Sequence, residues 1–245
     1  MEELHITHYE KCLARHYDWM IGDPEQFMLK MMEFFKAHQV ESHGIDLAID
    51  LGTGNGLQSI PLANLGYKVV AVDTSAKMLK QLKQREGYSD RITCVQADMV
   101  EFLERPSDEA SLIICMGDSL AYLPSFDALD RFFSGCFNKL SARGKVVITC
   151  REYGSSVKGD QRFIPIRTTE NKIMTVFLEY EKCHVKITDQ IYTFKDGSWN
   201  FQVGSYYKLR LTCSKLIEYA TLHCLQIIHC KVTNGMVEFV AMKPC

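Results

Sequence analysis

Short apolar runs alternate with segments of helical periodicity from Asp46 to Cys150. The expected strands are Asp46–Leu51, Lys68–Val72, Ile92–Val95, Ser111–Met116 and Lys145–Cys150. Helices are expected near Gln58–Leu65, Ser75–Arg85 and Phe126–Leu140. The runs SLIICM and KVVITC are almost wholly apolar, which is typical of strands covered on both faces. This alternation predicts an α/β fold with right-handed crossovers and a Rossmann-like, mainly parallel sheet.

After Cys150 the pattern changes to consecutive strands. These are Phe163–Thr168, Ile173–Glu181, Val185–Phe194 and Trp199–Leu211, with a hairpin turn at Asp196–Gly197 before the last one. Strict alternation in that strand predicts one apolar face, made by Trp199, Phe201, Val203, Tyr207, Leu209 and Leu211. A helix near Ser214–His223 and strands Leu225–Lys231 and Met236–Met242 complete the chain. We predict one domain over residues 1–245, with an N-terminal helical cap (1–44) and an antiparallel β insertion (151–211) that covers the site.

A glycine-rich turn carries the clearest chemical information. The segment from Asp50 to Gly56 (DLGTGNG) follows the first predicted strand and opens a helix, and its glycines allow close approach of a ligand. Asp73 ends the second predicted strand, where a carboxylate can accept both hydroxyls of a ribose. A dinucleotide fingerprint would need glycine where Leu57 stands, and Asp50 would repel a pyrophosphate but suits an ammonium group. The motif therefore favours S-adenosylmethionine over NAD.

On these residues the chain resembles the class I S-adenosylmethionine-dependent methyltransferases over nearly its whole length. The resemblance implies a seven-stranded sheet with an antiparallel last strand and the cofactor across the carboxyl ends of the strands. It implies that Asp98 holds the adenine amino group and that Met78 and Met99 flank the ring, although simple core packing of both methionines remains open. The predicted cofactor-binding residues are Tyr17, Asp50, Gly52, Thr53, Gly54, Asp73, Thr74, Met78, Asp98, Met99 and Met116.

Four further segments resemble glycine N-methyltransferase and related small-molecule N-methyltransferases. They are ARHYDWMIGD (Ala14–Asp23), VDTSAKMLK (Val72–Lys80), CMGDSLAYL (Cys115–Leu123) and SYYK (Ser205–Lys208). The resemblance implies an N-terminal segment folded over the cofactor and an arginine, here Arg151, that holds a substrate carboxylate. The chain departs from that family where Asp118 replaces an asparagine, Tyr122 a histidine and Met20 a tyrosine.

We predict Asp118, Tyr122, Arg151 and Tyr206 as catalytic residues. Methyl transfer by in-line displacement mainly needs an aligned nucleophile and exclusion of water, and Asp118 is suited to hold an ammonium or hydroxyl group or to accept the released proton. For Arg151 the alternative is a surface residue paired with Glu152 or Asp160. The predicted methyl acceptor is a small molecule that bears a carboxylate and is methylated on an amine nitrogen. The alternative function is a non-catalytic S-adenosylmethionine-binding sensor or partner subunit.

Composition narrows the remaining possibilities. The 28 basic and 30 acidic residues give a net charge of −2, which offers no general case for nucleic-acid binding. The basic excess of residues 143–245 mildly favours an anionic group on the substrate. No run approaches the length of a membrane helix, and the charged N-terminus lacks a secretory signal. Ten cysteines without a CxxC pair are expected to be reduced thiols in a cytoplasmic protein, and the eight histidines show no spacing that predicts a metal site.

Overall fold

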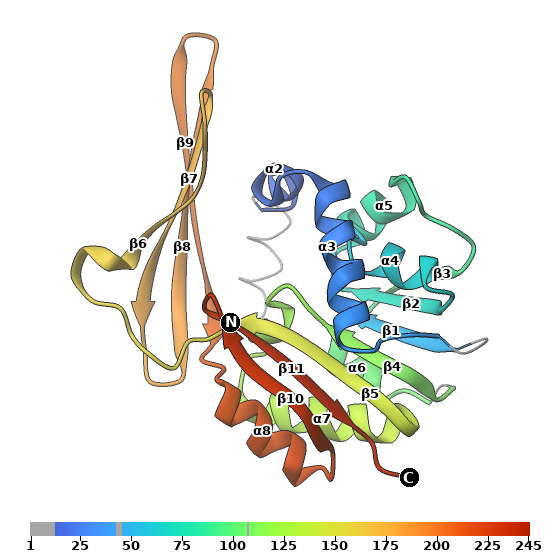
Figure 1. Ribbon diagram of the computed structural model, residues 1–245. Coiled ribbons are helices and arrows are strands. Elements are labelled where there is room, and N and C mark those ends of the chain that lie inside the picture. Colours follow the sequence, from blue (N-terminus) through green and yellow to red (C-terminus); the bar gives the residue numbers. More distant parts are fainter. Residues whose placement is uncertain (1–12, 43–45, 107) are drawn as a thin grey trace.

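The computed structural model describes residues 13–42, 46–106 and 108–245. Its centre is a seven-stranded sheet with the order β10-β11-β5-β4-β1-β2-β3 (Figure 1). Neighbouring strands of β1 to β5 are parallel, whereas β11 is antiparallel to both β5 and β10. The predicted Rossmann-like sheet is therefore confirmed. Its strands are β1 (Leu47–Leu51), β2 (Lys68–Asp73), β3 (Ile92–Gln96), β4 (Ala110–Cys115), β5 (Leu140–Arg151), β10 (Gln226–Thr233) and β11 (Met236–Met242).

Helices cover both faces of this sheet, which explains why its central strands are almost wholly apolar. One face packs against α3 (Pro24–Ala37), α4 (Ser59–Asn64) and α5 (Ala76–Gln84). The other packs against α6 (Met99–Glu104), α7 (Phe126–Lys139) and α8 (Cys213–Leu222). The core is densest under α7, where the fully buried rings of Phe132 and Phe133 meet edge to face, with centroids 5.5 Å apart.

Four antiparallel strands form a second sheet, the arm, which projects away from the first (Figure 1). They are β6 (Phe163–Thr169), β7 (Lys172–Tyr180), β8 (His184–Lys195) and β9 (Ser198–Leu209), and the short helix η3 (Gly159–Arg162) precedes them. The hairpin between β8 and β9 turns at Asp196 and Gly197, as predicted, with φ values of 52° and 77°.

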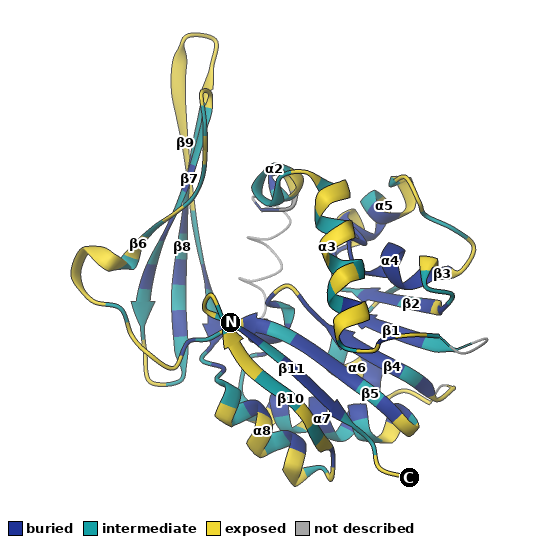
Figure 2. Ribbon diagram, viewed as in Figure 1, coloured by how far each residue is buried: buried dark blue, intermediate teal, exposed yellow. Residues whose placement is uncertain are grey.

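The apolar face predicted for β9 is buried only at its inner end. Leu209 is fully buried, but Trp199, Phe201 and Val203 are about half exposed, and the outer end of the arm is exposed in Figure 2. Tyr207 of the predicted face is only partly buried, and the core of the arm takes Tyr206 from the opposite face. The prediction that the whole apolar face is buried is therefore wrong for its outer part. The reason is that the outer end extends beyond the seven-stranded sheet, and within the described chain no layer covers it there.

The N-terminal segment bridges the arm and the sheet. It contains η1 (Leu13–Arg15) and α2 (Tyr17–Ile21), and α2 lies between the arm and α3 (Figure 1). On the arm side, the ring of His16 lies 3.3 Å from Gln202 Oε1, and Lys172 Nζ lies 4.4 Å from the Trp19 ring centroid. On the sheet side, Asp18 Oδ1 accepts hydrogen bonds from Asn55 at 2.6 Å and Arg85 at 2.8 Å. This segment is thus held at both ends.

Part of the predicted organisation falls on residues that are not described. Residues 1–12, 43 and 44 of the predicted cap, and with them the absence of a secretory signal, lie outside the described residues. The division into a cap (1–44) and an insertion (151–211) stays a prediction. No helix in the described part of the chain is long and apolar enough to cross a membrane.

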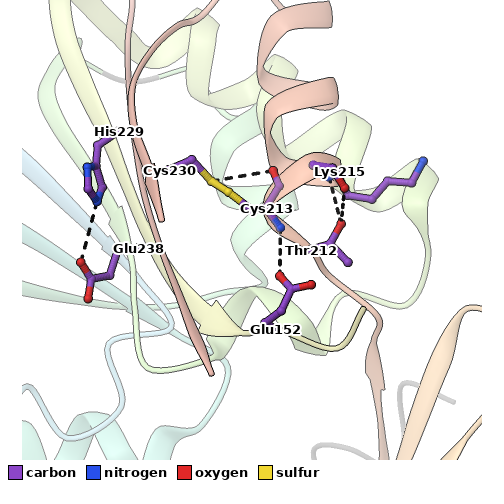
Figure 3. The surroundings of a disulfide bond; sticks show 8 residues. Glu152, Thr212, Cys213, Lys215, His229, Cys230 and Glu238 are labelled. Carbon is purple, nitrogen blue, oxygen red and sulfur yellow. Dashed lines mark hydrogen bonds and ion pairs between the residues drawn. A yellow bond between two sulfur atoms is a disulfide. The ribbon is translucent and has the colours of Figure 1, made fainter. Parts of the chain in front are cut away.

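One expectation about the cysteines is wrong. Cys213 at the start of α8 and Cys230 in β10 form a disulfide, with Cα atoms 6.3 Å apart (Figure 3). They stand 17 residues apart with no motif spacing, and they meet only because α8 packs beside β10. Cys115 and Cys150 are free and fully buried, as expected of thiols that act as small apolar side chains.

Candidate active site

The glycine-rich turn follows β1 at the carboxyl edge of the sheet. Gly52, Gly54 and Gly56 all have positive φ, at 74°, 55° and 87°. A Cβ on Gly52 would lie 2.6 Å from Ser119 Cβ, and one on Gly56 would lie 2.0 Å from Leu82 Cδ1. The turn therefore sits so close to the loop after β4 and to α5 that only glycine fits at these two positions.

Asp73 is fixed beside this turn. Its Oδ2 accepts a hydrogen bond from Gly54 N at 2.8 Å, and its Oδ1 accepts one from Ser75 N at 2.8 Å. Each carboxylate oxygen can accept more than one hydrogen bond, so the group retains the capacity to receive hydroxyl donors. The adjacent Thr74 is exposed, and its carbonyl accepts from Gln96 Nε2 at 3.1 Å. The position and orientation of Asp73 suit the predicted contact with a ribose.

Asp50 lies beneath the turn and is almost completely buried. Its Oδ2 accepts a hydrogen bond from Ser59 Oγ at 2.6 Å, and the hydroxyls of Ser59 and Thr53 are 2.7 Å apart. Burial raises the pKa of Asp50 to about 6, although the hydroxyls of Ser59 and Thr53 oppose the rise. A positive charge placed next to this buried carboxyl group would stabilise its ionised form, which agrees with the predicted contact to an ammonium group.

Both methionines predicted to flank an adenine lie beside the turn. Met99 Cε would be 3.8 Å from a Cβ on Gly52, and Met78 Cε 3.5 Å from one on Gly54. Met78 is completely buried, which agrees with the core-packing alternative, so its contact with a ligand stays a prediction. Asp98 is exposed and caps α6, because its Oδ1 accepts from Val100 N at 2.8 Å and from Glu101 N. Met116 is buried, and its carbonyl accepts from Ser119 Oγ at 3.0 Å.

A second cluster begins one residue before Ser119, with Asp118. The short helix η2 (Ser119–Tyr122) follows β4, and Ser119 Oγ donates to Gly52 O at 3.2 Å, so the cluster adjoins the glycine-rich turn. Asp118 is buried in a left-handed conformation with φ of 73°. Its Oδ1 accepts from Arg151 N at 2.9 Å, and its Oδ2 forms an ion pair with the buried ammonium of Lys208 on β9.

Two tyrosine rings stack against this ion pair. The rings of Tyr122 and Tyr206 have centroids 5.6 Å apart and an interplanar angle of 26°. Lys208 Nζ lies 4.6 Å from the centroid of Tyr122 and 5.8 Å from that of Tyr206. Burial acts to lower the pKa of Lys208, but Asp118, Tyr122 and Tyr153 outweigh it, so the pKa is raised and the amine stays protonated. Burial also raises the pKa of both tyrosines, which remain neutral phenols.

Tyr17 of α2 completes the cluster from above. Burial raises the pKa of its hydroxyl, and the nearby groups of Tyr122 and Asp73 raise it further. Tyr17 is therefore close to both the second cluster and the glycine-rich turn. The segment predicted to fold over the cofactor reaches this position through the contacts of Asp18 with Asn55 and Arg85.

The structure thus brings Asp118, Tyr122 and Tyr206 together, but it changes the role available to Asp118. Its carboxylate is already neutralised by Lys208, so the predicted roles of holding a substrate ammonium or accepting a proton lose support. Arg151 is exposed at the end of β5, and no described residue forms an ion pair with it within 4 Å. The alternative of a surface pair with Glu152 or Asp160 is not seen: Glu152 instead accepts from Cys213 N at 3.0 Å.

Sequence reasoning missed Lys208 as a site residue. It stands two positions after Tyr206, so the alternation of β9 places both side chains on one face. The position of Lys208 on the same strand face as the predicted site residue Tyr206 is the signal that could have identified it. The fully buried Asp189 of β8 was also missed, and its charge helps to raise the pKa of Tyr206.

The residues present fit an adenosyl sulfonium ligand. The fixed carboxylate of Asp73 provides acceptors for ribose hydroxyls, and the buried Asp50 provides charge for an ammonium. The glycine-rich turn lies beside both groups, since Gly54 N donates to Asp73 and the hydroxyl of Thr53 lies 2.7 Å from that of Ser59, which donates to Asp50. The rings of Tyr17, Tyr122 and Tyr206 are of the kind that stabilises a sulfonium, and such a contact stays a prediction.

Comparison with known proteins agrees with this geometry. Residues 48–144 match a methyltransferase domain family. The chain is similar to a glycine/sarcosine N-methyltransferase of Aphanothece halophytica, with 27% identity over 122 residues, which is 49% of this chain and 46% of that protein. The chain therefore spans about half the length of this curated relative.

Two solved structures show the same fold over most of the chain. An S-adenosylmethionine-dependent methyltransferase from Clostridium acetobutylicum ATCC 824 superposes with a TM-score of 0.75 and 19% identity, covering 97% of this chain and 99% of that one. The glycopeptide N-methyltransferase MtfA complexed with sinefungin superposes with a TM-score of 0.62 and 15% identity, covering 89% and 87%. Residues 48–144 are thus similar to a methyltransferase domain, and the described chain has the fold of these S-adenosylmethionine-dependent methyltransferases.

The ion pair between Asp118 and Lys208 leads to a stability prediction. Lys208→Met should lower the free energy of unfolding by about 3–5 kcal/mol, because it leaves a buried carboxylate without its partner. The double variant Asp118→Asn with Lys208→Met should recover much of that loss, since no buried charge remains. Urea unfolding of the three proteins measures both effects. A double variant less stable than Lys208→Met alone would contradict this account.

The raised pKa of Asp50 predicts a pH dependence of stability. The folded chain holds this proton more tightly than the unfolded chain, so the buried charge costs stability above about pH 6, and the cost is relieved as the pH falls towards 4. In Asp50→Asn this dependence disappears. The unfolding free energy of the variant minus that of the natural chain should rise by about 2–2.5 kcal/mol from pH 4 to pH 7. A difference that is constant over this range would show that Asp50 has an ordinary pKa.

Proposed function

We propose that the protein transfers a methyl group from S-adenosylmethionine to an amine nitrogen of a small, carboxylate-bearing molecule. The observation that carries the proposal is the enclosed cluster of Asp118, Lys208, Tyr122 and Tyr206 directly beside the glycine-rich turn. The relatives named above support the choice of nitrogen, because their names describe N-methyltransferases. A binding protein without chemistry would not need an acceptor cluster at this place.

The residues of the chain would serve mainly to bind and to align. When bound, S-adenosylmethionine supplies an activated methyl group, and Asp73 and Asp50 would hold its ribose and ammonium. The rings of Tyr122 and Tyr206 exclude water and orient the acceptor against the methyl group. Alignment of this kind can supply several kcal/mol, up to about 7–11 in the best cases.

A neutral amine does not need a strong general base to accept the methyl group. The ion pair also leaves the described cluster without a group suited to act as one. Lys208 stays protonated and Asp118 is neutralised by it, while the tyrosines remain neutral phenols. A neutral amine attacks directly and loses its extra proton to solvent afterwards. The cluster therefore acts through hydrogen bonds and shape rather than through proton abstraction.

Arg151 would provide the contact to the acceptor carboxylate. Its guanidinium is exposed and unpaired among the described residues, and its backbone N–H bonds Asp118, so it stands at the edge of the cluster. A guanidinium matches a carboxylate with two parallel hydrogen bonds.

The remaining parts of the proposal concern partners and location. The near-neutral net charge supports a small-molecule acceptor rather than a nucleic acid. A cytoplasmic location stays a prediction. The expectation that all cysteines are reduced no longer supports this location, since the Cys213–Cys230 disulfide is more typical of oxidising compartments.

The activity can be tested with methyl-labelled S-adenosylmethionine and a pool of amines and amino acids. We expect label to appear in one product whose mass rises by one or two methyl groups. Asp73→Asn is the matched control, because it should weaken cofactor binding in calorimetry while the circular dichroism spectrum is kept. Tight cofactor binding without transfer to any compound would favour the sensor or partner-subunit alternative, and absence of cofactor binding would reject both readings.

Arg151→Ala should raise KM for the acceptor about 10- to 100-fold, because a charge-assisted contact is worth about 1.5–3 kcal/mol. The kcat and the Kd for the cofactor should change little. Steady-state kinetics with Arg105→Ala as control tests this, since Arg105 is an exposed arginine after α6 and away from the cluster. With an amide analogue of the acceptor, Arg151→Ala and the natural chain should have similar KM values; an unchanged KM for the carboxylate form would reject the assignment.

A further inference from the structure

Three side chains with metal-binding atoms meet outside the cluster of Asp118, Lys208, Tyr122 and Tyr206. They are His38 at the end of α3, His229 on β10 and Glu238 on β11, and one nitrogen or oxygen of each lies within 4.8 Å of the others. Figure 3 shows His229 and Glu238 facing each other across the hairpin. Histidine spacing in the sequence does not reveal this group. His38 and His229 are 191 residues apart, and His229 and Glu238 are nine residues apart.

The distances suit a single ion between the three atoms. Glu238 Oε2 lies 3.9 Å from His38 Nε2 and 3.8 Å from His229 Nε2, which is too far for a direct hydrogen bond. Ligand atoms around one zinc ion, at about 2.0–2.2 Å from it, lie about 3.3 Å apart. Small rotations of these partly exposed side chains would close the difference.

The position of His229 gives an independent reason to expect a ligand. Its Nε2 is shielded from solvent and has no hydrogen-bond partner among the described residues. A buried polar atom without a partner costs about 1–3 kcal/mol, and such atoms are rare in folded proteins. An ion bound between the imidazoles and Glu238 would satisfy this atom.

The charges that face the group set limits on its affinity. Lys145 of β5 lies near His38, but its ammonium donates to the carbonyls of His38 and Gln39, at 3.3 and 2.9 Å. Lys231 lies opposite Glu238 in the register of β10 and β11, and it is exposed. Two lysines weaken the attraction for a dication, so the binding must come from coordination by nitrogen rather than from general negative charge.

We propose that His38, His229 and Glu238 form a binding site for a divalent transition-metal ion, with zinc as the best fit. Two imidazoles and one carboxylate are ligands typical of zinc, and a fourth position remains for water. Hard ions such as Mg²⁺ and Ca²⁺ prefer a shell of oxygens and are a poorer match. A bound ion would join the end of α3 to the β10–β11 hairpin at the edge of the sheet, and so stabilise the fold.

The full chain can be tested after treatment with chelator and removal of the chelator. Calorimetric titration with Zn²⁺ should show one equivalent bound, and Co²⁺ should give visible bands without the near-ultraviolet band of a thiolate ligand. Zn²⁺ should also raise the unfolding midpoint. His229→Gln should weaken Zn²⁺ binding at least tenfold and abolish the rise in the midpoint.

Glu238→Gln provides a second variant with the same expected loss, in case His229→Gln does not fold. His223→Gln is the matched control, because His223 faces the carboxylate of Asp130 at 2.9 Å and belongs to no group of three metal-binding side chains among the described residues, so it should leave Zn²⁺ binding unchanged. The proposal is overturned if neither Zn²⁺ nor Co²⁺ binds at micromolar concentration. Binding that is equal in the natural chain and both ligand variants, or a thiolate band with Co²⁺, would also overturn it. None of these outcomes depends on methyl transfer.

Discussion

The ion pair between Asp118 and Lys208 joins the two sheets of this protein at the active site. Asp118 belongs to the loop after β4 in the large sheet, and Lys208 to the inner end of β9 in the arm. Removing two charges from water costs several kcal/mol for each ion, and close pairing with further hydrogen bonds is needed to offset that cost. Arg151 N supplies one such bond, and the rings of Tyr122 and Tyr206 cover the ammonium. The base of the arm must therefore stay where it lies, because any separation would leave a buried charge alone.

The same pair separates two tasks within one site. On one side of the ion pair, the glycine-rich turn and Asp73 form a rigid surface that is fixed by backbone conformation and by short hydrogen bonds. On the other side, stacked tyrosines and an exposed arginine form a surface of side chains. Tyr17 lies over both, and the contacts of α2 with the arm and with α5 hold it there.

The sequence allowed most of the large sheet to be predicted, because strands buried on both faces leave long apolar runs and glycine marks the turn. The burial of the arm could not be predicted in the same way. Trp199 and Phe201 alternate like core residues, but only the three-dimensional path of the arm decides that they remain exposed.

The site shows the same division. Asp73 and Gly54 belong to a contiguous strand–turn–helix–strand pattern, so their neighbourhood follows from local order. Lys208 meets Asp118 across 90 residues, and Cys213 meets Cys230 through helix packing, so neither contact leaves a pattern in the sequence. The role predicted for Asp118 lost its support for this reason: a charged residue was recognised, but its distant partner was not.

The position of Tyr206 and Lys208 on one strand has a consequence for how such a protein diversifies. Apart from Tyr17, the residues proposed to hold the cofactor lie between positions 50 and 116, whereas the proposed acceptor cluster draws on both sheets. The arm contributes Tyr206 and Lys208 to it, and the other members are Asp118, Tyr122 and Arg151. Exchange of a few inward-facing side chains near the end of β9 would reshape the acceptor space and leave the methyl-donor surface intact. Donor binding and acceptor choice would thus depend on different parts of the chain, and substitutions in strand β9 alone would suffice to change the acceptor.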